Sequence, residues 1–364
     1  MGRRALVEDY IMKRFTYIVL LTLLAVAVYA GWFFFSKSDE SLKNQQAIVS
    51  ESVSEGGPAS PLASQGGPEI HPVSLPALMM KNFDGRELEL GRILEQNSAY
   101  TRYYITYKSL PAGEAGGELT ISGIMNKPAG EGPFPLLVLN HGYIDPQVYT
   151  NGRGLRREQD YFARRGYVVL HPDYRNHADS DSDPETDVRF RLGYAEDVIN
   201  AVLAAKNSGF DFIDGQRVGL LGHSMGGGVT LNVLVVRPEL VSAAMLYAPV
   251  NADYRLNYER WTKSRPETAA EIARRFGTPK ESPEFWDNIS AKNFFEKISA
   301  PILINHGTED ESVPYEWSVA LEQDLKVAGK DVTFYTYEGE KHEFIPDWSL
   351  MMQRTLEFFD SKLK

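Results

Sequence analysis

Cysteine is absent from the 364 residues of this chain. Its absence excludes disulfide bonds, a cysteine nucleophile, thiolate metal sites, iron–sulfur clusters and a lipidated N-terminal cysteine. Basic residues are also a minority, because 38 Lys and Arg stand against 49 Asp and Glu and give a formal net charge of −11. An acidic chain repels phosphate backbones, so we expect no nucleic-acid partner.

Patterns that bind metals or cofactors are also missing. Residues 179–183 begin like a calcium-binding loop, but its sixth position is Pro184 instead of Gly and its twelfth is Phe190 instead of Glu. The pair of glycines at Gly152 and Gly154 lacks the third glycine of a dinucleotide-binding turn. The sequence therefore predicts neither a metal site nor a cofactor.

One long apolar run occurs near the N-terminus. Phe15–Phe35 is 21 residues without a charge, and as a helix it would span about 31 Å, which matches a hydrocarbon core of about 30 Å. Four basic residues fall within residues 1–14, so the positive-inside rule predicts a cytoplasmic N-terminus and an extracytoplasmic remainder. The alternative is a cleaved signal peptide with small residues at Val28 and Ala30. The run continues past that point, which favours a transmembrane anchor.

Residues 36–79 are predicted to form a flexible linker. From Ser50 to Pro76, 15 of 27 residues are Ser, Gly or Pro, and this composition cannot bury a core. Alternating and continuous apolar runs begin after about residue 80. We therefore expect one folded domain over residues 80–364.

The folded domain has the pattern of an α/β protein. Apolar residues alternate in residues 103–107 and again from Leu119 to Met125, which predicts that an antiparallel hairpin opens the domain. Short continuous apolar runs then alternate with helical stretches, which is typical of a mostly parallel sheet with helices on both faces. The hairpin and these runs predict eight strands. The runs are Pro135–Leu139, Tyr167–Leu170, Arg217–Leu221, Ala243–Tyr247, Ile302–Ile304 and Val332–Tyr337.

A nucleophile motif lies between one of these strands and a helix. Gly222–Gly226 reads Gly-His-Ser-Met-Gly, the G-x-S-x-G pattern that is typical of the α/β-hydrolase fold. Glycines flank the serine because the turn is too tight for side chains at those positions. Ser224 is therefore the predicted nucleophile. His223 is not the predicted base, because neighbouring side chains on such a turn diverge.

The oxyanion formed during acyl transfer needs two preorganised donors. In this fold one donor is the backbone N–H of the residue after the nucleophile, here Met225. The other comes from the loop after the third strand, where Asn140–Tyr143 reads Asn-His-Gly-Tyr, and Tyr143 is the predicted donor. The Tyr143 hydroxyl is a further candidate donor, and His141 is predicted to be a structural residue of this loop.

A serine nucleophile needs a histidine base and a carboxylate that orients it, in the chain order Ser, acid, His. Asp310 follows the strand Ile302–Ile304 and is the predicted acid, with Glu309 and Glu311 as rival candidates. His342 follows the last strand and is the predicted base. His306 precedes the acid and is predicted to shape its turn.

These motifs resemble the α/β-hydrolase catalytic domain of the prolyl oligopeptidase family of serine peptidases, over about residues 98–364. Dienelactone-hydrolase-like and acyl-esterase relatives share most of them. Large family members also carry an N-terminal β-propeller, and we expect none here, because only about 60 residues separate the predicted membrane span from this domain. The motifs are Leu139–Gly142, Asp173–Arg175, Gly222–Gly227, His306–Asp310 with Val313-Pro314, and Glu338-Gly339 leading to His342 and Phe344.

Residues 251–299 are an insertion between the sixth and seventh predicted strands. The insertion is rich in aromatic residues, and we expect a helical cap that covers the site and shapes an apolar pocket. The alternative is an ordinary pair of surface helices. The aromatic residues are Tyr254, Tyr258, Trp261, Phe276, Phe285, Trp286, Phe294 and Phe295.

The sequence thus predicts a membrane-anchored serine hydrolase that is peptidase-like and acts outside the cytoplasm on a peptide or small-molecule substrate. Ser224, Asp310 and His342 form the triad of this hypothesis. A carboxylesterase that acts on small or lipid-like acyl esters is the alternative within the same class. A non-catalytic binding domain on a hydrolase scaffold is the alternative from another class. The oligomeric state is left open.

Overall fold

The computed structural model describes residues 70–110 and 117–364. The apolar run at residues 15–35 and most of the predicted linker lie outside these residues. Within them, no helix is both long enough and apolar enough to cross a bilayer. The membrane anchor therefore stays a prediction.

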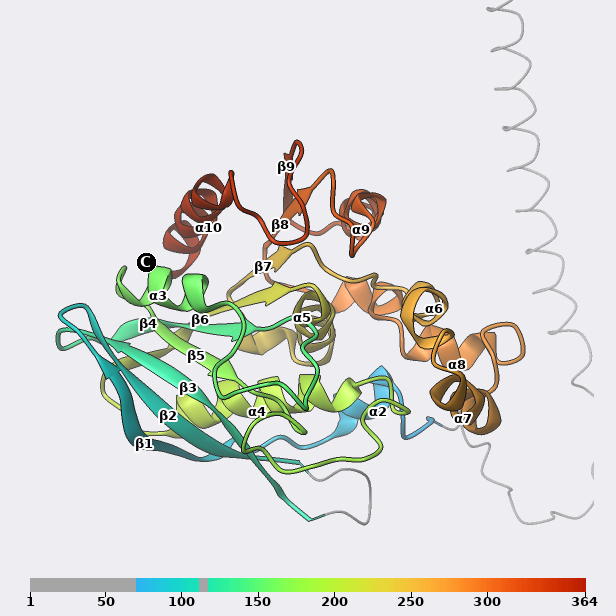
Figure 1. The fold of residues 1–364 in the computed structure, drawn as a ribbon, viewed down its shortest axis with the longest axis horizontal. Coiled ribbons are helices and arrows are strands. Elements are labelled where there is room, and N and C mark those ends of the chain that lie inside the picture. The colour runs from blue at the N-terminus through green and yellow to red at the C-terminus, as the bar shows by residue number, and fades with distance from the viewer. Residues whose placement is uncertain (1–69, 111–116) are drawn as a thin grey trace, which may run out of the picture. The chain divides into compact units, whose positions relative to one another are not determined.

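The described residues form a nine-stranded sheet in the order β1-β2-β3-β5-β4-β6-β7-β8-β9 (Figure 1). The pairs from β1 to β5 along this order are antiparallel and those from β5 to β9 are parallel, so the predicted α/β-hydrolase architecture is confirmed. The strands are β1 (Arg86–Gln96), β2 (Tyr100–Ser109), β3 (Leu119–Pro128), β4 (Phe134–Asn140), β5 (Val168–Pro172), β6 (Ile213–His223), β7 (Ala243–Tyr247), β8 (Ile302–Gly307) and β9 (Val332–Tyr337).

The prediction of eight strands was wrong by one, because β1 precedes the expected hairpin of β2 and β3. Most side chains of β1 are exposed and many are charged, and the strand has irregular register with β2. An exposed edge strand need not alternate between apolar and polar residues. The residues of β1 therefore show no period of two, and the strand was not predicted.

The folded domain also begins earlier than the predicted residue 80. Helix α2 (Leu75–Met80) is capped by the Ser74 side chain, which accepts a hydrogen bond of 3.1 Å from the Ala77 N–H. Leu75 and Leu78 are buried in the main hydrophobic core. A segment rich in Ser and Pro thus ends in a packed helix.

Helices cover both faces of the sheet (Figure 1). In β4, Leu136 and Val138 belong to one hydrophobic cluster and Leu137 and Leu139 to the other, as the alternation of a strand requires. Helices α2, α4 and α5 supply buried residues to the first cluster, and α3 and α10 supply the second. The larger helices are α3 (Arg156–Ala163), α4 (Leu192–Asn207), α5 (Met225–Val236), α9 (Tyr315–Val327) and α10 (Trp348–Leu363).

The insertion between β7 and β8 is helical, as predicted, and contains α6 (Tyr254–Asn257), α7 (Pro266–Phe276) and α8 (Pro283–Asn288). Most of its aromatic residues do not have the predicted role of shaping a pocket. Phe276 and Phe285 stack on each other with ring centroids 4.7 Å apart, and Trp286 is fully buried. These rings pack against the main hydrophobic core and Phe190, because a helical insertion must bury its apolar side against the rest of the domain.

Candidate active site

Ser224 lies at the sharp turn between β6 and α5. Its backbone has φ 55° and ψ −120°, a conformation that non-glycine residues rarely adopt and that is common at functional sites. A Cβ on Gly222 would collide with the backbone of Gly226, and one on Gly226 would collide with Asn140. The predicted strand–turn–helix context of the serine is therefore present, and both glycines are sterically required.

Asp310 lies in the loop after β8, and its side chain is fully buried. Oδ2 accepts hydrogen bonds from His342 Nδ1 at 2.7 Å and from His306 Nε2 at 3.0 Å. Oδ1 accepts from the N–H groups of Ser312 and Val313, both at 2.8 Å. Burial by itself would raise the pKa of Asp310, but the bonds from His306, His342 and Val313 outweigh it and hold the pKa well below its usual value. The carboxylate is thus ionised at neutral pH.

The rival acids lie elsewhere. Glu309 and Glu311 are exposed, and the Glu311 carboxylate accepts a bond of 3.3 Å from the backbone N–H of His342 and not from its ring. Because Nδ1 of His342 faces a carboxylate, it must carry the ring proton. Nε2 is then the basic nitrogen of His342, as a general base requires.

His306 contacts the acid directly, which sequence reasoning missed. Its Nε2 faces two acceptors, Asp310 Oδ2 and the Val313 carbonyl oxygen at 3.2 Å, so Nε2 carries the proton. Nδ1 lies 2.7 Å from Ser318 Oγ and accepts its hydrogen bond. The spacing of four residues between His306 and Asp310 was the signal available in the sequence.

His342 and Ser224 both line each of two cavities. The ring of His342 packs beside that of His223, with centroids 4.7 Å apart. Burial lowers the pKa of His223 to about 3, so this second imidazole is neutral at pH 7. His223 Nε2 lies 3.3 Å from the His342 carbonyl oxygen, and His223 therefore supports the loop of the predicted base.

The loop after β4 runs directly against the nucleophile. A Cβ on Gly142 would lie 3.1 Å from Ser224 Cβ, which is tighter than an ordinary contact, so a larger residue there would press on the nucleophile. Tyr143 follows in this loop, and Met225 is the first residue of α5, where backbone N–H groups have no partner within the helix. Both predicted oxyanion donors thus belong to segments that meet at Ser224.

His141 is a structural residue of that loop, as predicted. Its ring is fully buried and stacks between Tyr149 and Tyr174, with centroid distances of 4.9 Å and 4.4 Å. Burial, together with His171 and His177 nearby, lowers its pKa to about 3. A neutral imidazole therefore supports the segment that carries Tyr143.

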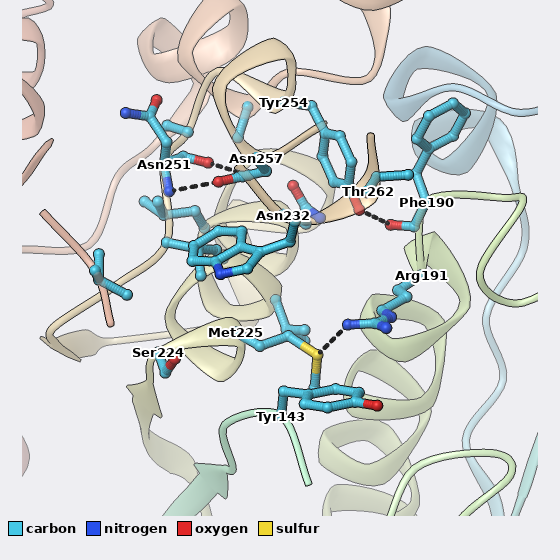
Figure 2. A pocket seen from close by; sticks show the side chains of 18 of the residues that line it. Tyr143, Phe190, Arg191, Ser224, Met225, Asn232, Asn251, Tyr254, Asn257 and Thr262 are labelled. Atoms are coloured by element: carbon cyan, nitrogen blue, oxygen red, sulfur yellow. Dashed lines mark hydrogen bonds between the residues drawn. The ribbon is translucent and has the colours of Figure 1, made fainter. Parts of the chain in front are cut away.

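The larger cavity has a volume of about 510 Å³ and the smaller one about 200 Å³. Figure 2 shows Ser224, Met225 and Tyr143 at one side of the larger cavity and Tyr254 and Asn257 of the cap at another. The cap reading is thus favoured over a pair of surface helices. The cap supplies Tyr254 and Trp261 to the lining, but Phe276, Phe285 and Trp286 do not reach it.

Comparisons with known proteins agree with this geometry. A sequence model of the prolyl oligopeptidase family matches residues 153–364. A Bacillus subtilis (strain 168) protein named "Uncharacterized peptidase YtmA" is 26% identical over 239 residues, which cover 65% of this chain and 87% of that protein. A probable dipeptidyl peptidase 4 of Aspergillus flavus is 28% identical over 238 residues, which cover 63% of this chain but only 29% of that much longer protein.

Solved structures show the same fold. A putative dipeptidyl aminopeptidase IV from Bacteroides ovatus superimposes with a TM-score of 0.59 at 21% identity, over 74% of this chain and 37% of that one. Acetyl xylan esterase 1 from Thermoanaerobacterium sp. JW/SL YS485 superimposes with a TM-score of 0.56 at 21% identity, over 75% of this chain and 88% of that one. Peptidases and esterases thus share this architecture.

Proposed function

The chain belongs to the prolyl oligopeptidase family, and from this membership we propose that it is a membrane-anchored serine hydrolase that cleaves peptide bonds through an acyl-enzyme. The observation that carries the proposal is the 2.7 Å bond between His342 Nδ1 and Asp310, beside a cavity that also contains Ser224. Because this bond orients the His342 ring, which lines the same cavity as Ser224, it supports a role for Nε2 as the base.

In the proposed reaction the Ser224 hydroxyl oxygen attacks the acyl carbon while His342 Nε2 takes its proton. The N–H groups of Tyr143 and Met225 stabilise the oxyanion. His342 then gives the proton to the leaving amine, which departs, and the acyl group stays on Ser224. A water molecule, deprotonated by His342, then attacks the acyl carbon, and His342 returns this proton to the Ser224 oxygen as the bond to the serine breaks and the carboxylic acid leaves. Asp310 remains ionised and stabilises the imidazolium in both halves.

A fluorophosphonate probe tests the nucleophile. We expect the full chain in detergent to be labelled at Ser224, and Ser224→Ala to lose the label. Ser264→Ala is the matched control, because Ser264 lines the same cavity without a proposed role in the chemistry. Labelling that survives in Ser224→Ala would contradict the assignment of the nucleophile. No labelling of the native chain would count against the proposal and favour a non-catalytic binding domain.

Carboxylester hydrolysis is the second candidate activity, and the mixture of peptidases and acetyl xylan esterases among the structural neighbours favours its inclusion. An ester reacts more readily than an amide at the same site, so both activities need the same triad. Matched peptidyl nitroanilides and nitrophenyl esters separate them. A peptidase cleaves both, whereas an esterase cleaves only the ester.

The anchor proposal rests on the charge-free run Phe15–Phe35 and the basic residues before it. We expect the full chain to stay with membranes after alkaline carbonate extraction and the catalytic domain to be digested by protease added outside intact cells. Release of the chain by carbonate would contradict the anchor and favour a cleaved signal peptide.

A further inference from the structure

Three charged side chains meet in the wall of the larger cavity. Asp187 accepts a hydrogen bond from Arg191 Nε at 2.7 Å through one oxygen and from Arg265 Nη1 at 2.9 Å through the other. Arg191 lies at the start of α4, whereas Arg265 comes from the cap just before α7. One carboxylate is therefore shared by two guanidinium groups, and the cluster carries an excess positive charge.

This excess is not neutralised by the rest of the cavity lining. In the part of the chain that the structure describes, Asp187, Arg191 and Arg265 are the only Asp, Glu, Lys or Arg residues that line this cavity. Burial alone would raise the pKa of Asp187, but Arg191 and Arg265 outweigh it and hold the pKa below its usual value. The cavity is thus locally cationic, although the chain as a whole is acidic.

Arg191 retains unused hydrogen-bonding capacity. Besides its bond to Asp187, the Arg191 side chain donates a bond of 3.3 Å from Nη1 to Met225 Sδ and stacks 4.8 Å above the Tyr143 ring (Figure 2). A thioether is a weak acceptor, and a guanidinium has five N–H donors. Because Arg191 contacts the side chains of both proposed oxyanion residues, an acyl group bound at Ser224 lies next to it.

We propose that the acyl segment of the substrate carries a carboxylate, which the cluster of Asp187, Arg191 and Arg265 recognises. This inference rests on the proposed function and names its substrate class. A free terminal ammonium finds no such partner, because Asp187 is the only carboxylate of the cavity lining within the described residues and both of its oxygens are already engaged. The cavity therefore selects acidic acyl segments and disfavours free amino termini.

Four nitrophenyl esters test this selection on the full chain in detergent. They share a dipeptidyl acyl segment and differ in charge: free-amine Ala-Ala, acetyl-Ala-Ala, succinyl-Ala-Ala and acetyl-Asp-Ala. We expect kcat/KM to be roughly tenfold to a hundredfold higher for a carboxylate-bearing substrate than for acetyl-Ala-Ala, and lowest for the free amine. The succinyl and Asp arms show whether the carboxylate comes from the terminal group or from a side chain.

Two variants of the cluster must shift the preference in opposite directions. Arg265→Gln leaves a neutral pair of Asp187 and Arg191, so the preference for the carboxylate should fall to nearly none. Asp187→Asn leaves two unpaired cations, so the preference should rise. Arg274→Gln is the control, because Arg274 forms an exposed pair with Glu271 on the same cap helix and does not line the cavity.

A purely structural bridge between cap and core would give another result. If the cluster is only such a bridge, both variants should change kcat/KM of all four substrates alike, or shift the preference for the carboxylate in the same direction. Either outcome would overturn the inference. A native chain that prefers acetyl-Ala-Ala over the carboxylate-bearing substrates would also overturn it. If Asp187→Asn fails to fold, Arg265→Gln against Arg274→Gln decides. If no ester is cleaved and no fluorophosphonate label appears, the proposed function fails, and this inference fails with it.

Discussion

The loops at the strand ends and the cap contribute differently to the site. The loops hold Ser224, Asp310 and His342 through glycine sterics and hydrogen bonds at fixed backbone positions. The cap lines the cavity with Tyr254 and Trp261 and packs against the main hydrophobic core through Phe276, Phe285 and Trp286. The residues of the proposed chemistry therefore lie in short local motifs, whereas the proposed selectivity depends on contacts between segments far apart in the chain.

The largest expected effect is a loss of kcat in the strand-end loops that a change in the cap does not produce. Ser224→Ala should lower kcat by about a million-fold, since triad residues act as a unit. Trp261→Ala, in the cap wall, should act mainly on KM. Steady-state kinetics with a nitrophenyl ester measure both. Equal losses of kcat in the two variants would abolish the distinction between chemistry and selectivity.

Acid should destabilise the strand-end region before the cap. Burial lowers the pKa of His141 and His223 to about 3 and that of His171 to about 4, whereas the unfolded value is about 6.5. The unfolded chain therefore binds more protons below pH 6.5, and stability falls as the pH drops from there toward 4. Each histidine should cost about 2 kcal/mol at pH 5 relative to neutral pH.

Hydrogen exchange at pH 7.5 and pH 5 measures this difference, because residues 251–299 contain no histidine. Exchange should increase first in the loops after β4 and β6. The variant His223→Phe should reduce the pH dependence of the unfolding free energy. Earlier opening of the cap would contradict the assignment of the acid effect to these buried imidazoles.

The stability of the cap should depend more on its buried residues than on those that line the cavity. Trp286 is fully buried and packs against Phe190 and Tyr258, with centroid distances of 5.3 Å and 4.9 Å. Trp286→Ala should therefore lower the unfolding free energy by about 4 kcal/mol. Trp261→Ala is the matched control and should cost far less. Urea denaturation followed by circular dichroism compares them, and equal losses would refute the distinction between the buried side of the cap and its cavity wall.

The smallest effect concerns the second histidine at the acid. His306→Ala removes the ring that donates to Asp310, so kcat should fall by roughly tenfold to a hundredfold with little change in KM, because Asp310 and then His342 lose their fixed positions. Ser318→Ala should have a milder effect in the same direction. Rescue of kcat by His306→Gln, whose amide also donates, would support positioning. An unchanged kcat in His306→Ala would assign His306 to folding alone.

The sequence predicted those parts in which local sterics determine structure. Gly222 and Gly226 identify the turn of Ser224 because no other residue fits, and the parallel strands follow from continuous apolar runs. β1 was missed because an exposed edge strand has no apolar periodicity. Helix α2 was missed because Ser and Pro, which resemble a linker, here cap and begin a helix.

The remaining features depend on tertiary contacts that no local pattern encodes. The rings of Phe276, Phe285 and Trp286 are apolar whether they line a cavity or fill a core, so composition could not separate the two. The sharing of Asp187 by Arg191 and Arg265 joins residues 78 positions apart. The role of His306 required knowing which way its ring points from the end of β8.

The donors around Asp310 also limit how this enzyme can evolve. Two imidazoles and two backbone N–H groups converge on one carboxylate whose side chain has a single methylene. Exchanging Asp310 with its neighbour Glu309 or Glu311 would conserve charge and composition, but the extra methylene of a Glu at position 310 would move the carboxylate oxygens away from those four donors. Residues around the proposed triad can therefore be substituted far more freely than the acid itself can change position.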